Sequence, residues 1–394
     1  MKITRIRTTP VNIPLDVPFH WSVGAYPGSS KCIVEVETDA GITGLGEAPW
    51  WHFGPIIEHE LAPRIIGRDP LDIAAIESLC LPSVQITANT GENAVVIAFG
   101  ALEMALWDIR GKEWGQPIHK LLGGAVRQDI PFTEYFSFRE AAGTAGGEMS
   151  AEAIVDYCLR MREAHGSTMF EGKLSLGDPE LEIRTVRKLR EALGPEAMIR
   201  LDSNMQWSLP TARHVLQAIE PYNIRNYEDP VATFEEMQRL RQHSAIPFSS
   251  HVPDLRRALA LGVPDAFVTN FAVHGGIGRT LRFIAGCEAT GVDFWCYSGD
   301  TGICTAAYLQ VSAATAWIRE PAQSLFRWQV GDVIEGGPFR QTGNTVRVPD
   351  GPGLGVTLDR AALDRWHRHF VEHGPMQHFH DPFRPGHFRR LPLN

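Results

Sequence analysis

The sequence predicts an α/β protein in which a closed (β/α) barrel follows a smaller N-terminal α+β domain. From about residue 128 onward, short strand-like runs alternate with helix-like runs, a pattern that predicts a parallel sheet. Seven or eight such units in roughly 200 residues fit a closed barrel better than an open sheet. Neither a GxGxxG motif after an early strand nor a P-loop lysine motif occurs, which disfavours a nucleotide-binding fold.

The elements of the N-terminal domain follow from two periodicities. Polar and apolar side chains alternate in residues 2–12 and 31–38, which predicts two strands, and the turn at residues 39–41 suggests a hairpin. Apolar residues then recur at helical spacing over about 92–112, which predicts a helix with one buried face.

The barrel strands are predicted at residues 130–138, 168–175, 198–202, 224–228, 246–251, 266–270 and 292–297. The helices are predicted at residues 151–163, 181–192, 211–219, 234–242, 255–261 and 278–290, with a short one near the C-terminus at about 360–372. We therefore expect an α+β domain at 1–128, the barrel at 129–347, and a C-terminal segment at 348–394 that returns to the N-terminal domain.

Composition places the chain among ordinary globular proteins, with 44% apolar and 21% charged residues. The 46 acidic and 37 basic residues give a net charge of -9, which argues against a nucleic-acid partner. Six scattered cysteines without a CxxC pair indicate reduced thiols. Neither a signal peptide nor an apolar run of membrane-spanning length is visible. We expect a cytoplasmic protein that does not bind membranes.

Polar side chains stand at the C-terminal ends of successive predicted strands, the edge where a β/α barrel carries its functional residues. These residues are Lys173, Asp202, Glu228, His251 and Asn270. Two carboxylates, Asp202 and Glu228, favour a hard divalent cation such as Mg²⁺, although Asp202 alone would equally suit a helix N-cap. His251 is either a third ligand, since imidazole suits Mn²⁺ or another divalent ion, or a contact to the substrate.

Lys173 lies one strand before Asp202 and is the candidate base. A partly desolvated lysine near a divalent cation has its neutral form favoured, so it can accept a proton near neutral pH. The alternative is a structural ion pair with Asp202 or Glu228. Removal of a proton α to a carboxylate forms an enediolate, which a bound metal stabilises. The set therefore predicts a small-molecule carboxylate substrate.

Several motifs resemble the enolase superfamily, in its mandelate racemase, muconate-lactonizing and glucarate dehydratase branch. They are Gly44–Glu47, Leu102–Lys112 with Pro117–Gly124, Leu201–Asn204, Glu228–Pro230, Gly275–Ile277 and Val348–Gly355. The resemblance covers nearly the whole chain and implies a (β/α)7β TIM-like barrel with an N-terminal α+β capping domain. It also implies a Mg²⁺-dependent enzyme, since a Lys or His base with Mg²⁺ is this superfamily's general pattern, and a homo-oligomer, either a dimer or an octamer.

The sequence departs from the family's pattern at the strand ends. The usual Lys-x-Lys pair reads Glu171-Gly172-Lys173, so the resemblance places Lys173 at the proton-abstracting position and Glu171 beside the substrate. The less favoured register would place Ser175 there. The third metal ligand, usually Glu, Asp or Asn, is His251, and the second base of racemases is Asn270, which we expect to contact substrate instead.

These departures favour one-base chemistry. Racemisation needs an acid or base on each face of the carbon, whereas elimination of water from an acid sugar needs one base. Tyr135, Tyr26 and Tyr297 are candidate donors to the leaving group, although Tyr135 also suits a half-buried barrel position and Tyr26 an ordinary turn. Asp300 lies where lactonizing relatives carry an acidic residue. A dehydratase is therefore the leading hypothesis, with a cycloisomerase and a catalytically impaired ligand-binding barrel as alternatives.

Two loops of the N-terminal domain, at about 15–30 and 48–55, are expected to close the pocket and set its specificity. Their aromatic residues include His20 and Trp51, which either stack on the substrate or pack against the barrel rim. Asn204 is expected to contact substrate as well. Apart from Lys173, only Lys31 and Arg139 are candidates to bind a second substrate carboxylate, which weakens the case for a diacid.

Overall fold

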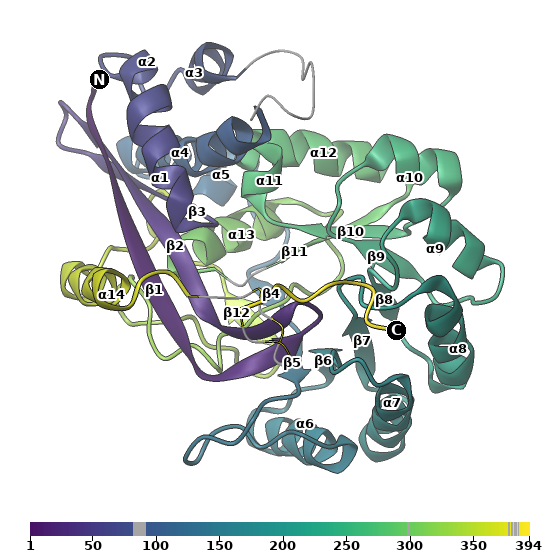
Figure 1. Ribbon diagram of the computed structural model, residues 1–394. Helices are drawn as coiled ribbons and strands as arrows, with labels where there is room; N and C mark the ends of the chain where they lie inside the picture. Colours follow the sequence, from purple (N-terminus) through teal and green to yellow (C-terminus); the bar gives the residue numbers. More distant parts are fainter. Residues whose placement is uncertain (82–91, 298–299, 377–378, 380, 382–383, 385) are drawn as a thin grey trace.

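The computed structural model describes residues 1–81, 92–297, 300–376, 379, 381, 384 and 386–394. Figure 1 shows an antiparallel sheet with helices (purple to blue) beside a ring of parallel strands surrounded by helices (teal to green). This architecture confirms the predicted TIM-like barrel and its N-terminal α+β capping domain. Within the described ranges, every helix is too short or too polar to cross a bilayer.

The capping domain is built on the antiparallel strands β1 (Ile3–Trp21), β2 (Gly24–Thr38) and β3 (Thr43–Ala48), in that order. The predicted turn at 39–41 joins β2 to β3. The predicted helix is α4 (Glu92–Glu113), which packs directly on β3: a Cβ at Gly46 would lie 2.0 Å from the carbonyl oxygen of Ala101. The remaining helices are η1 (Trp51–Phe53), α1 (Gly54–Ile56), η2 (Ile57–Leu61), α2 (Ala62–Ile65), α3 (Ile73–Cys80) and α5 (Ile118–Leu121).

Residues 15–30 belong to the ends of β1 and β2 and the two-residue turn between them, so the expectation of a loop over this range was wrong. Phe19 pairs with Tyr26, and Trp21 pairs with Gly24. Buried and more exposed side chains alternate from Ile13 to Phe19, which shows that the strand pattern continues beyond residue 12. The expected loop at 48–55 is likewise replaced by η1 and the first residues of α1.

The barrel consists of parallel strands arranged side by side in chain order: β5 (Glu134–Ser137), β6 (Met169–Lys173), β7 (Met198–Asp202), β8 (Asn226–Glu228), β9 (Phe248–Ser250), β10 (Ala266–Thr269) and β11 (Asp293–Cys296). A short eighth segment closes the ring. The amide of Thr133 donates to the Ala322 carbonyl (2.9 Å), and the amide of Gln323 donates to the Cys296 carbonyl (3.2 Å).

Helices cover the outside of the barrel (Figure 1). They are α6 (Ala151–His165), α7 (Pro179–Leu193), α8 (Leu209–Ile219), η3 (Glu220–Tyr222), α9 (Phe234–Arg241), α10 (Leu255–Leu261), α11 (Phe271–His274), α12 (Ile277–Thr290) and α13 (Gly302–Ala314). Two further strands form a separate antiparallel pair. β4 (Asp129–Pro131) precedes β5 in the chain, and β12 (Thr345–Arg347) follows α13.

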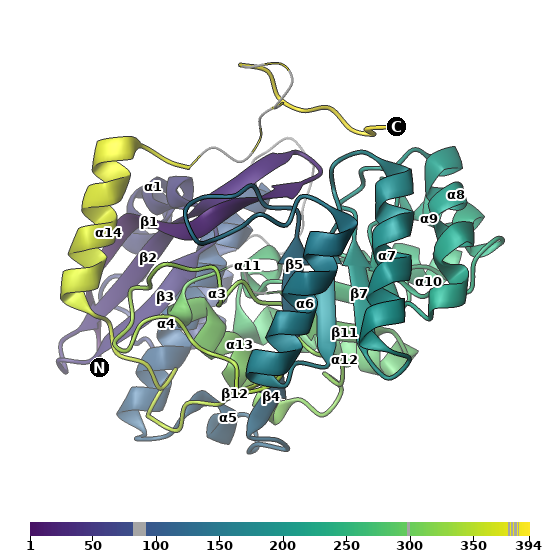
Figure 2. The same ribbon diagram turned by 90° about the horizontal axis from the view of Figure 1, so that it is seen from below.

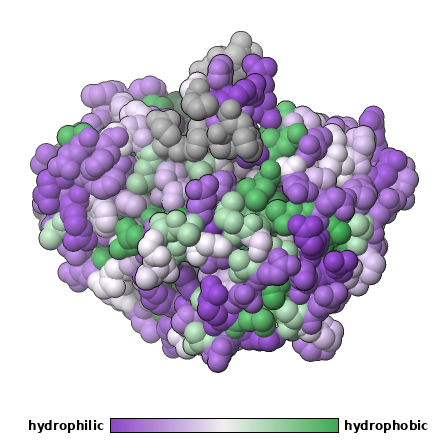
Figure 3. All heavy atoms as spheres, turned by 60° about the horizontal axis from the view of Figure 1, so that its bottom comes forward, coloured by the Kyte–Doolittle hydropathy of each residue, from purple (hydrophilic) through white to green (hydrophobic). Residues whose placement is uncertain are grey.

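The C-terminal segment contacts both parts of the molecule. Its helix α14 (Arg360–His373) packs on β1, and the Asn12 side chain donates to the carbonyl of Gly374 (2.9 Å). Close to the C-terminus marked in Figure 2, the Leu393 amide donates to the Gln206 carbonyl in the loop after β7 (2.7 Å). The face of the molecule in Figure 3 is mostly hydrophilic, including the side on which α14 lies.

Candidate active site

A cavity of about 220 Å³ lies where the C-terminal ends of the barrel strands meet the capping domain. One part of its wall is polar and comes from the barrel: Lys173, Asp202, Asn204, Glu228, His251, Thr269, Asn270, Gln323 and Ser324. The other part is aromatic or aliphatic: Phe19, Trp21, Tyr26, Tyr135, Val268, Val273, Tyr297 and Leu325. The predicted strand-end residues are thus brought together at one mouth, as expected for a barrel of this kind.

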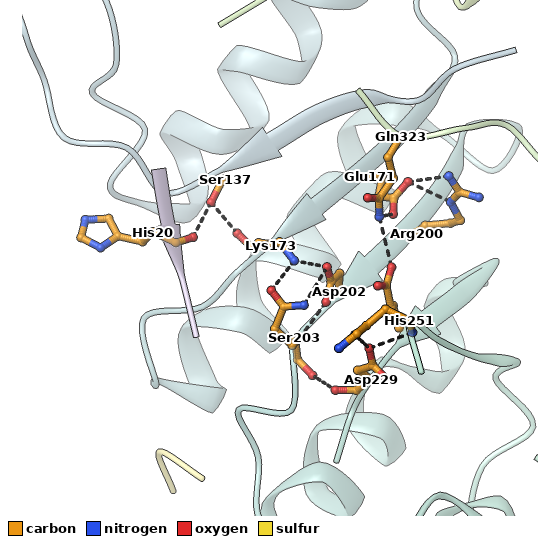
Figure 4. A network of polar contacts seen from close by, with 12 residues as sticks. His20, Ser137, Glu171, Lys173, Arg200, Asp202, Ser203, Asp229, His251 and Gln323 are labelled. Atoms are coloured by element: carbon orange, nitrogen blue, oxygen red, sulfur yellow. Dashed lines mark hydrogen bonds and ion pairs between the residues drawn. The ribbon is translucent and has the colours of Figure 1, made fainter. Parts of the chain in front are cut away.

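Lys173 ends β6 beside Asp202, which ends the neighbouring β7. Its ammonium group donates to the Asp202 carboxylate and to the Asn204 side-chain oxygen (Figure 4). The amide of Asn204 in turn donates to Asp202 (2.8 Å), and Asn204 has a positive φ of 45° that turns the loop back onto the strand end. The Lys173 ammonium therefore sits at the cavity wall in a fixed, buried ion pair.

Asp202 and Glu228 end neighbouring strands and are both nearly inaccessible to solvent. Burial raises the pKa of Asp202, and Lys173 opposes that shift. Burial also raises the pKa of Glu228, and the nearby Asp202 and Asp229 carboxylates raise it further. Clustered buried carboxylates of this kind repel one another unless a cation lies between them.

His251 and Asp229 extend this carboxylate cluster. His251 Nδ1 bonds the Asp229 carboxylate, which raises the pKa of the imidazole. One ligand atom each of Glu228, Asp229 and His251 lies within 4.8 Å of the others. The second oxygen of Asp229 is buried and accepts no hydrogen bond from the described residues. A carboxylate on one ring nitrogen is the usual partner of a histidine whose other nitrogen binds metal.

These donors fit a divalent ion. Asp202 and Glu228 would supply the hard oxygen ligands that Mg²⁺ prefers, and His251 an imidazole that also suits Mn²⁺. Glu228 and His251 belong to the cluster with Asp229, whereas the Asp202 carboxylate bonds Lys173. Asp229 adds a fourth group, which was not among the expected ligands although it directly follows Glu228 in the Glu228–Pro230 motif.

Glu171 lies below the cavity and is not on its wall, so its expected contact with substrate has no support from the geometry. Its carboxylate accepts from Arg200 and from the Thr133 hydroxyl (3.0 Å). Both members of this ion pair, which we call the floor pair, are 1% exposed. Arg200 also lies 4.4 Å from the ring centroid of Trp295, a cation–π contact.

Gln323 connects the floor pair to the polar wall. Its side-chain nitrogen donates to Glu171 and to the Glu228 carboxylate (3.1 Å; Figure 4). Strand alternation could have revealed Arg200, which faces the same side as Asp202 two residues later. Gln323 lies on the short eighth segment, for which the sequence gives little strand signal.

The three candidate tyrosines all line the cavity. Tyr26 is on β2, where its hydroxyl hydrogen-bonds that of Ser29 (2.8 Å). Burial raises the pKa of Tyr26, Tyr135 and Tyr297 alike, so the three phenols stay protonated at neutral pH. Each can therefore donate a hydrogen bond to a group in the cavity.

Asp300 is not one of the described residues that line the cavity. Its carboxylate bonds the Lys31 ammonium on β2 and accepts from the Tyr308 hydroxyl (2.7 Å). Lys31 and Asp300 are 6% and 3% exposed, so they form a buried ion pair between the capping domain and the barrel. Nearby, burial and Asp300 raise the pKa of Glu47 to about 7.

Of the remaining residues predicted to contact substrate, Asn270 lies on the cavity wall, and His20 and Trp51 do not. Asn270 lines the cavity, and its side-chain oxygen accepts from the Val273 amide to cap α11. His20 and Trp51 are not on the cavity wall: the carbonyl of His20 accepts from Ser137, and Trp51 packs against Phe370 of α14. For Trp51, the structure thus favours packing over stacking on substrate.

Comparison with known proteins places this geometry in a family. Residues 153–362 match "Enolase C-terminal domain-like", and residues 3–123 match "Mandelate racemase / muconate lactonizing enzyme, N-terminal domain". The chain belongs to the enolase superfamily. Its type is that of mandelate racemase and muconate-lactonizing enzyme, as the sequence motifs implied.

Similar proteins in this superfamily carry different reaction names. A probable glucarate dehydratase of Streptomyces coelicolor is 30% identical, covering 94% of this chain and 92% of the relative. A chloromuconate cycloisomerase of Pseudomonas putida is 29% identical, covering 95% and 100%. An enolase structure from Pseudomonas fluorescens with magnesium, potassium and tartrate has a TM-score of 0.84 and 26% identity, covering 95% and 93%. Superfamily members are metal-dependent lyases and isomerases, and the different reactions of these relatives leave the reaction of this chain open.

Proposed function

We propose that this protein is a divalent-metal-dependent lyase that removes the proton α to a carboxylate and eliminates a β-hydroxyl as water. The observation that carries the proposal is the arrangement of Lys173, Asp202 and Glu228 at adjacent strand ends on one cavity wall. Asn270, on the far side of the barrel mouth, cannot act as a base. One base therefore serves both halves of the reaction.

Asp202, Glu228 and His251 would hold the divalent ion, Mg²⁺ or Mn²⁺, which when bound stabilises the negative charge of the enediolate. Lys173 accepts the α-proton as the C–H bond breaks. As the β-carbon–oxygen bond then breaks, the departing oxygen takes this proton back from Lys173, either directly or through a phenol of Tyr135 or Tyr297 that Lys173 then reprotonates. Water leaves, the lysine is regenerated, and the enol product becomes a 2-keto acid.

A cycloisomerase remains the second candidate, because the same base and carboxylates serve that reaction and cycloisomerases are among the similar proteins. The acidic residue that motivated it, Asp300, is bound to Lys31 and Tyr308 instead of facing the cavity. An acid sugar is the substrate class that the resemblance favours for the dehydratase. The products of the two reactions differ in mass, because only the dehydratase product has lost water.

The test is a panel of hydroxy acids, including aldonic and aldaric acids, incubated with Mg²⁺ in D₂O. We expect a 2-keto product from the wild type and exchange of the α-proton. Lys173→Ala should lower both rates by about a hundredfold or more. Lys188→Ala, at a surface ion pair with Glu152, is the matched control and should behave as wild type. Equal rates for wild type and Lys173→Ala would refute the proposal, and a product of unchanged mass would favour the cycloisomerase.

A further inference from the structure

The apolar part of the cavity wall is formed by two layers of the molecule. Phe19, Trp21 and Tyr26 come from the β1–β2 hairpin of the capping domain, and Val268 and Leu325 come from the barrel. The hairpin aromatics are packed on one another: the Phe19 and Tyr26 rings are stacked at 5.1 Å, and Trp21 meets Tyr26 edge-on at 5.8 Å. This wall is therefore already ordered by packing within the protein.

The described residues that line the cavity carry positive charge on the polar wall alone. Among the described lining residues, Lys173 and His251 are the groups that can carry it. The two cations that the sequence offered for a second substrate carboxylate are both occupied elsewhere. Lys31 is paired with Asp300 in a buried contact.

Arg139 is equally committed. It is 3% exposed, and its guanidinium donates to Glu148 (3.0 Å) and to Asp16 (2.9 Å). It also lies over the Trp328 ring at 4.4 Å. A second carboxylate entering the cavity would therefore meet the apolar wall without a free cation from these residues, and a buried charge without a partner is strongly disfavoured.

Tyr26, Tyr135 and Tyr297 can bond a substrate hydroxyl, but the rest of this wall disfavours hydroxyl groups. Phe19, Val268 and Leu325 are 3%, 1% and 9% exposed and offer neither donor nor acceptor in their side chains. Each sugar hydroxyl pressed against them would lose its bonds to water without replacement. Methylene groups in that position would instead gain from leaving water.

We propose that the substrate has a single carboxylate and the α- and β-hydroxyls that the elimination needs, and that its remaining chain or ring is uncharged and largely apolar. The inference rests on the proposed function for the carboxylate end, which the polar wall and its divalent ion bind. It changes the expected substrate class from a polyhydroxylated sugar acid or diacid to an apolar monoacid. Phe19, Trp21, Val268 and Leu325 are then the residues that set specificity.

Three six-carbon acids with the same 2-hydroxycarboxylate end test the proposal: 2-hydroxyhexanoate, gluconate and 2-hydroxyadipate. Their affinities for the Mg²⁺-loaded protein are measured by calorimetry. We expect 2-hydroxyhexanoate to bind more tightly than the other two, by about tenfold for every two methylene groups that leave water. Val268→Thr, which adds a hydroxyl to the wall at nearly constant volume, should reduce that preference severalfold. Val371→Thr, at a 67% exposed position on α14, is the control.

Equal or tighter binding of gluconate or 2-hydroxyadipate would overturn the inference, as would failure of 2-hydroxyhexanoate to bind at millimolar concentration. Arg389 lies near the carbonyl of Trp21, outside the cavity wall. If 2-hydroxyadipate binds most tightly of the three acids and Arg389→Ala abolishes that difference in affinity, the C-terminal segment supplies a second carboxylate site. 2-Hydroxyhexanoate and 2-hydroxyadipate lack a β-hydroxyl and bind without turnover, and the affinity for gluconate is measured with Lys173→Ala so that it too is read without turnover. Absence of α-proton exchange with every acid would therefore refute the proposed function while leaving the substrate preference to be judged separately.

Discussion

The floor pair should be essential to the stability of the barrel, and Arg200→Met tests this. Arg200 and Glu171 fill a part of the barrel interior where branched apolar side chains are usual. Methionine has a similar length and is apolar, so the substitution removes the charge while leaving little empty space. The Glu171 carboxylate would remain buried with donors from Thr133 and Gln323 alone.

The expected cost follows from the loss of a partner at a buried charge, which is about 3–5 kcal/mol. Glu171→Gln in the same chain removes the stranded charge while keeping an oxygen that can accept from Thr133. The double variant Glu171→Gln/Arg200→Met should therefore recover most of that loss. A stranded carboxylate can also escape its cost by binding a proton, so the deficit of Arg200→Met should shrink as the pH falls from 8 to 5.

Urea unfolding of the wild type, both single variants and the double variant gives the four free energies of a double-mutant cycle. The reasoning predicts a large coupling energy between Glu171 and Arg200. It would be refuted if Arg200→Met cost less than about 1 kcal/mol, or if the two substitutions were additive. A cost that did not change with pH would show that Glu171 keeps another cationic partner.

Three further changes have defined outcomes. Lys31→Met strands Asp300 between the two domains and should lower the free energy of unfolding by about 3–5 kcal/mol, whereas Lys2→Met at the surface should change it little. Burial raises the pKa of Glu182 to about 8, so its contribution to stability is full below its unfolded pKa and lost as the pH rises through 8. In the wild type the free energy of unfolding should therefore decline between pH 5 and 9, and Glu182→Gln should remove up to about 4 kcal/mol of this decline, measured by urea unfolding. The same pH dependence in wild type and variant would contradict this prediction. Asp229→Asn should weaken Mn²⁺ binding about 10–100-fold by calorimetry through misplacement of His251, with exposed Asp156→Asn as control.

Local patterns predicted the barrel strands well because each buried run is short, apolar and bounded by a helix. The helix α13 was not predicted, since residues 302–313 are buried all round and the segment has no amphipathic periodicity. The eighth segment was missed for a related reason: it is short and contains Pro321. The hairpin at 15–30 was taken for a loop, although the alternation that marks strands continues through it.

In the candidate site, the positions of the strand-end residues could be predicted from the sequence, and their side-chain partners could not. Lys173, Asp202, Glu228 and His251 reach one cavity because strand ends in a barrel converge, a rule that sequence alone can apply. Side-chain partners do not follow from that rule. Asp300 lies at the expected strand end, yet its carboxylate bonds Lys31, which is 269 residues away in the chain. Such pairings depend on how two domains dock and cannot be read from local spacing.

The charges of the polar wall connect the candidate base to the candidate metal ligands. With the floor pair balanced internally, Lys173 faces Asp202, and Glu228 and Asp229 face His251. When Lys173 acts as a base it must be neutral, and Asp202 then loses its cationic partner in a buried site. A divalent ion held by these carboxylates would supply the missing charge. The proposed mechanism therefore needs the ion for a neutral lysine as well as for the enediolate, so α-proton exchange should fail without a divalent ion even for a substrate that binds.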